Sequence, residues 1–591
     1  MVFSPEMVMD MRRLFFIVFV FVSLTASAQN VSIDPIMRLC GVTTPEELDS
    51  YEVERLSDYQ QTPLQVNRSS LSDLQKSGLF TPFQAASIMD YRSRHGDILS
   101  FVELAALDGF GQETVEILRS FVALESHTLP GQRRTAHKRL KQDLSLRGGG
   151  RADDDLEYMC GLKYRVEYGG LGLSLSGSRS YGDASYVSGN LSWNHRLGKI
   201  IVGDYNARFG QGLCLWNSSV IGGLTSPSAF MRKPSGLSAT YSFTGSSAMT
   251  GIAADMEIGR WRTSFLLNMP DLKEGPVGML VPALNISWFG RYGHASLTHS
   301  MTFSDCTADF RIPQMRTAAD ASLCIGGINL FGEVAYDWVC RSAAAVCGTD
   351  FRASEDLRLA ALVKYFPPSG YSNEYGAAVS GQYSAGRWIR IKGREGFGSS
   401  VRRSTGIFSM EMSYFPKSKS KDGGKSVQMK MHTEWDFMLT DFLLLKCRLT
   451  ERLRTWGEKS RTDVRLEARY MSEHIHAAMR LNALKCVGVG LLGYAEGGYI
   501  GRKLSSYMRV GVFRIDDWDD RIYVYERDAP GSFNVPAYYG RGLWVACNLS
   551  WRLASWCRSY LRTSYMDYPF MPAEKRKPGR AELKIQFVFR L

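Results

Sequence analysis

The feature that most constrains this chain is an alternation of apolar and polar residues that recurs from about residue 144 to residue 591. In residues 427–437, for example, every second residue is apolar, aromatic or Thr, and the residues between them are Gln, Lys, His, Glu and Asp. Because successive side chains of a β-strand point to opposite faces, each such segment is predicted to be a strand with one apolar and one charged face. The same pattern occurs in residues 162–168, 464–470 and 583–591.

The apolar faces recur without any intervening helical layer that could cover them. A soluble β-sandwich shows the same alternation, but the opposite faces here carry long Arg, Lys and Glu side chains, as a water-filled or salt-bridged lumen would. In lipid every backbone polar group must be paired internally, so such strands have to close into a ring. The prediction is a mainly β protein, a large antiparallel transmembrane β-barrel of roughly 16–20 strands over residues 144–591.

Composition and the chain end agree with a barrel in an outer membrane. Aromatic residues make up 12% of the chain, including 28 Tyr and 12 Trp, which is typical of interfacial aromatic girdles. The amphipathic segment at residues 583–591 resembles the targeting strand that the barrel assembly machinery recognises. Such strands usually end in an aromatic residue, whereas this one ends in Leu591 with Phe589 two positions before it. The predicted partners are therefore outer-membrane lipid and the assembly machinery.

The first residues predict export. Arg12 and Arg13 precede an apolar run at residues 14–24, and Ala26-Ser27-Ala28 supplies a small-x-small cleavage pattern, so residues 1–28 are predicted to be a signal peptide. No later stretch is long and apolar enough for a transmembrane helix.

Residues 29–143 follow a different pattern from the barrel. Residues 29–60 form an acidic lead segment predicted to be helical, and residues 61–124 have helical spacing with short Gly-containing connections. We predict that residues 61–124 form a small all-α domain in the periplasm. Residues 125–143 form a linker whose basic residues are Arg133, Arg134, Lys138, Arg139 and Lys141.

Two Gly-containing turns lie about thirty residues apart in residues 61–124, one at Gly78-Leu79 and one at Gly109-Phe110-Gly111. This segment resembles the helix-hairpin-helix module of DNA-uptake competence proteins. In that module the hairpin glycines let the backbone approach a phosphate, and the next helix start binds the anion. The second hairpin has this form, whereas the first has Phe80 in place of its second glycine.

Two further segments resemble a family of bacterial outer-membrane barrels that carry this module at their N-terminus. They are residues 203–216, with Gly203-Asp204-Tyr205 and Phe209-Gly210-Gln211-Gly212-Leu213, and a later region with Tyr525-Glu526 and Gly540-Arg541-Gly542. That family has no established biochemical activity, so the resemblance implies architecture and not a reaction.

Charge separates two functional hypotheses. Acidic residues outnumber basic ones in residues 61–124, and Asp108 and Glu113 flank the second hairpin, whereas phosphate binding normally relies on Lys and Arg. The leading hypothesis is therefore a non-enzymatic outer-membrane barrel, a scaffold or conduit, whose helical domain binds an unidentified periplasmic protein or caps the barrel. The alternative is a DNA-binding outer-membrane protein for DNA uptake or handling, using the hairpins and the basic linker.

No motif predicts catalysis, a metal or a cofactor. His474 and His476 lack a third ligand in the sequence around them, and the GxGxxG match that starts at Gly488 lacks the βαβ unit that it requires. The charged residues of the strands are predicted to meet in the lumen as an ion-pair network, in preference to an ion-selective pore. Examples are Arg165, Glu167, Glu434, Arg448, Glu467 and Arg469.

Overall fold

A computed structural model describes residues 33–591 except 126–139, 154, 183–184, 196, 218–222, 244–247, 270–279, 291, 305–310, 355, 394–395, 420–423, 441, 458–459, 502, 573 and 575. The signal segment and the linker residues Arg133, Arg134, Lys138 and Arg139 lie outside the described residues, and Lys141 is the first residue of β3. Among the described residues, no helix is both long and apolar enough to cross a membrane.

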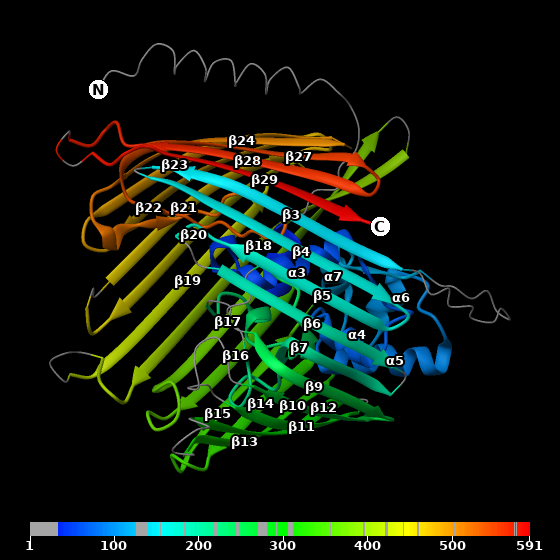
Figure 1. Ribbon diagram of the computed structural model, residues 1–591. Coiled ribbons are helices and arrows are strands. Elements are labelled where there is room, and N and C mark those ends of the chain that lie inside the picture. The colour runs from blue at the N-terminus through cyan, green and yellow to red at the C-terminus, as the bar shows by residue number, and fades with distance from the viewer. Residues whose placement is uncertain are drawn as a thin grey trace.

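The described strands close into an antiparallel barrel, which confirms the predicted fold class (Figure 1). The last strand, β29, pairs with the first, β3, and the described part of the chain contributes 24 strands to the ring. The strands are β3 (Lys141–Ala152), β4 (Leu156–Tyr168), β5 (Leu171–Arg179), β6 (Ser185–His195), β7 (Gly198–Arg208), β9 (Met249–Ile258), β10 (Trp261–Asn268), β11 (Val281–Phe289), β12 (Gly293–Ser304), β13 (Arg311–Ile325), β14 (Ile328–Asp337), β15 (Ser342–Arg352), β16 (Leu357–Phe366), β17 (Glu374–Gly393), β18 (Gly396–Phe415), β19 (Ser426–Met438), β20 (Leu443–Arg454), β21 (Ser460–Met471), β22 (Ile475–Lys485), β23 (Val489–Ile500), β24 (Leu504–Ile515), β27 (Gly540–Ala554), β28 (Cys557–Asp567) and β29 (Arg580–Arg590).

The predicted number of 16–20 strands is wrong because too many residues were allotted to connections. At one end of the barrel, neighbouring strands are joined by turns as short as two residues, such as 169–170 and 326–327. Each strand with its connection therefore uses less chain than expected.

The barrel is apolar outside and polar inside. On β5, Leu171, Leu173 and Leu175 are exposed, whereas the alternating residues Ser174 and Ser176 are buried. On β22, Met479 and Leu481 are likewise exposed, whereas Arg480 and Asn482 are buried inside the ring. An apolar exterior around a closed strand ring is the arrangement of a transmembrane β-barrel.

The longer connections lie at the opposite end from the short turns, and two of them fold back into the ring. We call residues 209–235 inner loop 1; it includes the 3-10 helix η3 (Pro227–Ala229) and leads to the short strand β8 (Gly236–Ala239), which pairs with the end of β7. We call residues 516–539 inner loop 2; it contains η4 (Trp518–Asp520), β25 (Ile522–Tyr523) and β26 (Ala537–Tyr538). Because outer-membrane barrels have short periplasmic turns and longer extracellular loops, both inner loops enter from the extracellular end.

Residues 33–125, which we call the plug, form a small helical domain with its own core. Its elements are α2 (Ile33–Cys40), η2 (Pro45–Glu47), α3 (Ser50–Gln61), β1 (Leu64–Gln65), α4 (Leu71–Lys76), α5 (Pro82–His95), α6 (Phe101–Ala106), α7 (Gln112–Leu118) and β2 (Val122–Ala123).

Side-chain caps start the plug helices where the sequence supplies a short polar residue. Ser70 and Asp73 form a reciprocal capping box at α4, and Thr81 and Gln84 form another at α5. The acidic lead segment and residues 61–124 share one apolar core, which contains Ile36 and Leu56 as well as residues of all the later helices. The two predicted segments are therefore one unit.

The plug lies inside the barrel. The prediction placed this domain in the periplasm. Figure 1 shows its blue helices surrounded by strands, with α5 and α6 toward the end where β29 finishes. Polar contacts from the plug reach β4, β7, β10, β17, β19, β21 and β22, which are distributed around the ring. Of the two roles predicted for the domain, this position corresponds to capping.

Candidate functional site: the plugged lumen

The acidic lead segment meets Arg residues on the inner face of the wall. Glu46 accepts hydrogen bonds from Arg480 Nη1 at 2.6 Å and from Arg465 Nη1 at 3.2 Å. It also accepts one from the Tyr525 backbone N–H in inner loop 2, at 3.1 Å. Burial alone would raise the pKa of Glu46, but the adjacent guanidinium groups lower it well below its ordinary value. Glu46 therefore joins the plug, the wall and an inner loop as a charged carboxylate.

A second contact of this kind lies on α3. Glu52 forms ion pairs with Arg55 on the same helix and with Arg208 at the end of β7. Burial works toward a higher pKa, but these two guanidinium groups together lower the pKa of Glu52 to about 2. Glu54, two residues further along α3, accepts a hydrogen bond from Lys163 Nζ of β4 at 2.5 Å and another from the Ser242 hydroxyl.

Further polar contacts complete the attachment around the ring. The pairs are Asp34 with Arg469, Thr43 with His432, Tyr51 with Asn206, Gln75 with Arg262, and Glu113 with Gln382. By contrast, no residue of the described barrel strands belongs to the apolar core of the plug, and inner loop 2 contributes only Phe533. The plug is thus held in the wall by hydrogen bonds and ion pairs, not by a shared hydrophobic core.

The two predicted hairpins lie against the protein itself. Gly78 has a positive φ of 61° and faces the side chain of Arg55, which donates to the carbonyl of Ser77; Leu79 beside it is buried in the core. A Cβ on Gly111 would collide with the Arg352 guanidinium of β15. Phosphate binding by these hairpins stays a prediction.

The second hairpin has the backbone form that its sequence predicts. Gly109 and Gly111 have φ values of 85° and 94°, a region in which residues with a Cβ are strained, and Phe110 between them is buried. The Gly109 carbonyl accepts a hydrogen bond from Gln84 of α5 at 2.8 Å.

Inner loop 1 is fixed by a buried carboxylate that the sequence analysis did not single out. Glu333 of β14 accepts hydrogen bonds from the backbone N–H groups of Gln211 at 2.5 Å and Leu213 at 3.2 Å. Gly210 and Gly212 have φ values of 60° and 87°, and both pack closely, Gly210 on this carboxylate and Gly212 on Arg232. The Gly-Gln-Gly motif therefore serves to place a tight turn on Glu333.

The other segment singled out in the sequence also faces inward. Glu526 accepts hydrogen bonds from Arg562 of β28, from the Tyr538 hydroxyl and, at 3.1 Å, from the Asn534 side chain, which fixes inner loop 2 inside the ring. Arg541 instead pairs with Asp516 at the exposed rim. Both inner loops contact the plug, inner loop 1 through Ser226 to Gly41 and inner loop 2 through Tyr525 to Glu46.

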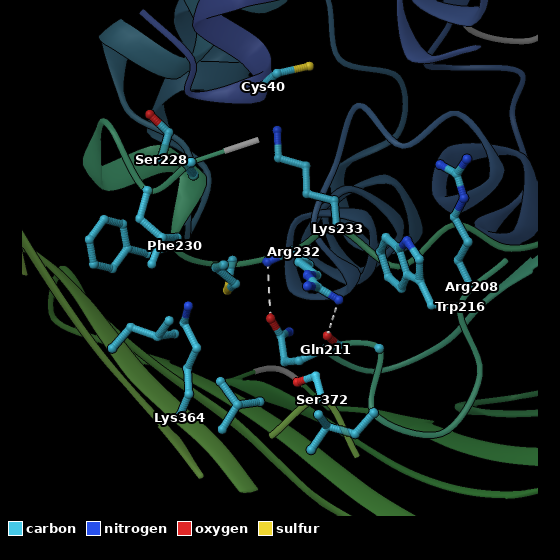
Figure 2. Close-up of a pocket in the computed structure, with 18 of the residues that line it drawn as sticks. Cys40, Arg208, Gln211, Trp216, Ser228, Phe230, Arg232, Lys233, Lys364 and Ser372 are labelled. Atoms are coloured by element: carbon cyan, nitrogen blue, oxygen red, sulfur yellow. Dashed lines mark hydrogen bonds between the residues drawn. The ribbon is translucent and has the colours of Figure 1, made fainter. Parts of the chain in front are cut away.

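A cavity of about 670 Å³, which we call the chamber, lies between the plug, inner loop 1 and the wall. The plug contributes Leu39, Cys40 and Arg55, and strand β16 contributes Leu362 and Lys364. Figure 2 shows Trp216, Phe230, Arg232 and Lys233 of inner loop 1 around this space, with the two hydrogen bonds that link Arg232 to Gln211.

The predicted lumen charges pair as expected from an internal ion-pair network. Arg165 pairs with Asp143 at 2.8 Å, Lys446 with Glu434 at 2.7 Å, and Glu467 with Arg469. Glu167 is exposed near the end of β4. His474 is exposed, whereas His476 is buried 3.5 Å from Glu496. Within the described residues no group of three His, Cys, Asp or Glu side chains is placed to bind a metal.

A scan against models of known families finds no match for this sequence, and a search of curated proteins finds no relative. The resemblance of residues 61–124 to helix-hairpin-helix modules therefore rests on their sequence pattern alone.

Among solved structures, the chain is similar to several proteins of Pseudomonas. The P. aeruginosa protein OccK11 (OpdR) matches 76% of this chain and 96% of its own, with 10% identity and a TM-score of 0.29. The P. aeruginosa protein OccK7 (OpdD) matches 76% and 98%, with 8% identity and a TM-score of 0.30. A BenF-like porin from P. fluorescens Pf-5 matches 76% and 99%, with 10% identity and a TM-score of 0.28. Similarities of this size carry no argument about the function of this chain.

Proposed function

We propose that this protein is an outer-membrane conduit closed by its own N-terminal domain, and that movement of the plug opens the lumen. The observation that carries the proposal is the attachment of the plug, which rests on polar side chains distributed around the inner wall. The plug has an apolar core of its own, to which Phe533 alone contributes from the rest of the described chain. The domain can therefore leave its place as a unit.

The chemistry of the wall supports reversible closure. When ion pairs break in water, both partners are hydrated, whereas two apolar faces would stay exposed at a high cost in free energy. The wall residues that face the plug, including Arg208, Arg465 and Arg480, would then line an aqueous channel with polar side chains.

We also propose that a periplasmic protein drives the opening. Leu99, which precedes α6, and Val102, in its first turn, are 68% and 76% exposed although they are apolar. Figure 1 shows α6 toward the end of the barrel where β29 finishes, which is the end with the short turns that we assign to the periplasm. A partner that binds this face reaches the plug without entering the lumen.

No feature of the described geometry favours DNA handling. The second hairpin faces Arg352 of the wall, and the first faces Arg55.

Conductance in planar lipid bilayers tests the conduit. Deletion of residues 33–124, with the rest of the chain kept, should convert a closed barrel into one with a large and stable conductance. The double variant Glu46→Gln/Glu52→Gln, which weakens the attachment without removing the plug, should open in brief steps.

Folding of each barrel is checked by heat-modifiable migration on gels, and Glu116→Gln, an exposed carboxylate of α7, serves as the matched control. A folded deletion variant that conducts no more than the intact protein would overturn the proposal.

A further inference from the structure

The outer surface of the barrel is hollowed over β21, β22, β23 and β24, which are neighbours in the ring (Figure 1). We call this hollow the outer groove; it has a volume of about 670 Å³. Its walls include Leu466, Leu481, Leu491 and Val512, whose side chains are exposed on the outer face of the strands. The outer groove is therefore a depression in the apolar surface that faces the membrane, and it is separate from the chamber inside the ring.

A glycine opens the floor of the outer groove. Gly493 of β23 pairs with Leu481 on β22 and with Val512 on β24, and both of these side chains point outward. The φ of Gly493 is not in the left-handed region, so its backbone does not require glycine. A Cβ at this position would lie 3.1 Å from Leu481 Cδ2. A larger side chain would therefore fill the floor of the groove.

Two arginines lie at one end of the outer groove. Arg514, near the end of β24, and Arg541, near the start of β27, are directly opposite each other on the two sides of inner loop 2. Both belong to the groove lining, and both side chains are exposed. Because inner loop 2 enters from the extracellular end, these cations lie at the level of the lipid head groups of the outer leaflet.

The two guanidinium groups converge on one carboxylate. Asp516 accepts hydrogen bonds from Arg541 Nε at 2.5 Å and from Arg541 Nη2 at 2.9 Å, and its Oδ2 lies 3.9 Å from Arg514 Nε. One carboxylate between two guanidinium groups leaves an excess of positive charge. Within the described part of the chain, the Arg514 guanidinium donates no hydrogen bond. Since a guanidinium binds phosphate through parallel N–H groups, this end of the groove has both the charge and the donors for a phosphate.

An aromatic residue of another connection borders the outer groove. Phe570, between β28 and β29, is 59% exposed and belongs to the same lining as Arg514 and Arg541. Aromatic rings and cationic side chains at the end of an apolar face are typical of the membrane interface. The outer groove thus combines an apolar floor with an interfacial ring and an excess cation, which suits a phosphorylated lipid.

We infer that the outer groove binds the lipid A part of lipopolysaccharide, with an acyl chain over Gly493 and a phosphate on Arg514 and Arg541. Lipopolysaccharide is the lipid of the outer leaflet of an outer membrane, and its lipid A carries phosphate beside several acyl chains. The position of the two arginines at the extracellular end therefore favours lipid A over a phospholipid of the inner leaflet. The inference is independent of the plug and of conduction through the lumen.

Native mass spectrometry of the full-length protein in detergent tests the inference, with purified diphosphoryl lipid A as the probe. Lipid A should bind saturably and about ten-fold more tightly than dephosphorylated lipid A or dioleoylphosphatidylethanolamine. Arg514→Gln/Arg541→Gln should weaken lipid A binding about ten-fold, and Gly493→Leu, which keeps both charges but fills the floor, should cause a loss of similar size. The matched control Arg179→Gln/Arg341→Gln removes two exposed arginines at the same end of the barrel, several strands away, and should bind as the wild type does.

Lipid A binding by Arg514→Gln/Arg541→Gln that equals that of the control would overturn the inference. Unchanged binding by Gly493→Leu would overturn it too, because the acyl chain would then lie elsewhere on the barrel. Equally tight binding of dephosphorylated lipid A or of dioleoylphosphatidylethanolamine would contradict recognition of the lipid A phosphate. Heat-modifiable migration shows that each variant is folded before it is titrated.

Discussion

At the scale of single residues, the acidic character of the N-terminal segment has a structural explanation. The sequence shows Glu46, Glu52 and Glu54 close together before the helical domain, and this charge argues against phosphate binding. The structure pairs these carboxylates with Lys and Arg of the inner wall. Their charge could be read from the sequence, but their partners could not, because Arg208 and Arg465 are separated from them by more than one hundred and fifty residues.

The exchange Glu52→Gln should loosen the plug. It removes the charge that faces Arg55 and Arg208, and leaving a buried cation without its partner costs on the order of 3 kcal/mol. Amide hydrogen exchange of α3 should then be about 100-fold faster, since each 1.4 kcal/mol is a factor of ten. The exposed Glu116→Gln serves as the control, and equal exchange rates in both variants would contradict the role of Glu52.

Acid should also release the plug. The pKa of Glu52 is about 2 in the folded protein and about 4.5 in an unconstrained chain, so its contribution to stability is complete above about pH 4.5. This contribution is lost as the pH falls toward 2, and Glu46 shifts in the same direction. Pepsin, which is active in this range, should cleave the plug progressively faster below pH 4.5. A cleavage rate that does not change with pH, once corrected for pepsin activity, would contradict this expectation.

At the scale of elements, motifs in the inner loops could be recognised in the sequence, but the contacts that these motifs make could not. The turn glycines at positions 210 and 212 could be recognised, and their positive φ values are the reason that glycine is needed. Their anchor, Glu333, lies 122 residues from Gln211 in the sequence and looks like any other inward-facing charge of a strand. An alternating pattern gives the face of a residue but not which distant loop it binds.

Glu333→Gln should release inner loop 1. The carboxyl group accepts two backbone N–H groups of the turn, and an amide of the same size accepts these hydrogen bonds more weakly. Hydrogen exchange at Gln211 and Leu213 should accelerate at least ten-fold, while strands on the far side of the ring stay protected. The matched control is Glu451→Gln, which makes the same exchange on another strand, β20. Equal exchange rates at Gln211 and Leu213 in both variants would contradict the role of Glu333.

At the scale of the whole molecule, alternation alone predicted the barrel. It could not predict the strand number, which depends on the length of each connection, or the position of the helical domain. Periodicity reports that the inner face is polar but not whether water or protein covers it. The acidic lead segment precedes strands that carry Lys and Arg on their polar face. This difference in charge is the sequence feature that indicates a position of the helical domain inside the lumen.

Residues 33–125 alone should fold. Their apolar core is formed almost entirely by the segment itself, and the pairing of β1 with β2 joins residues 64–65 to residues 122–123. The isolated segment should give a helical circular dichroism spectrum and unfold cooperatively on heating. A spectrum of random coil would show that the wall, and not the core, maintains the domain.

The pairing of the last strand with the first has a consequence for biogenesis. The plug is complete after residue 125, whereas the seam between β3 and β29 cannot form until the final residues have been synthesised. The contacts within the plug are local, and local contacts form faster than those that close a long loop. The helical domain is thus a ready-made template, and an open, curved sheet can wrap around it before the seam seals it in place.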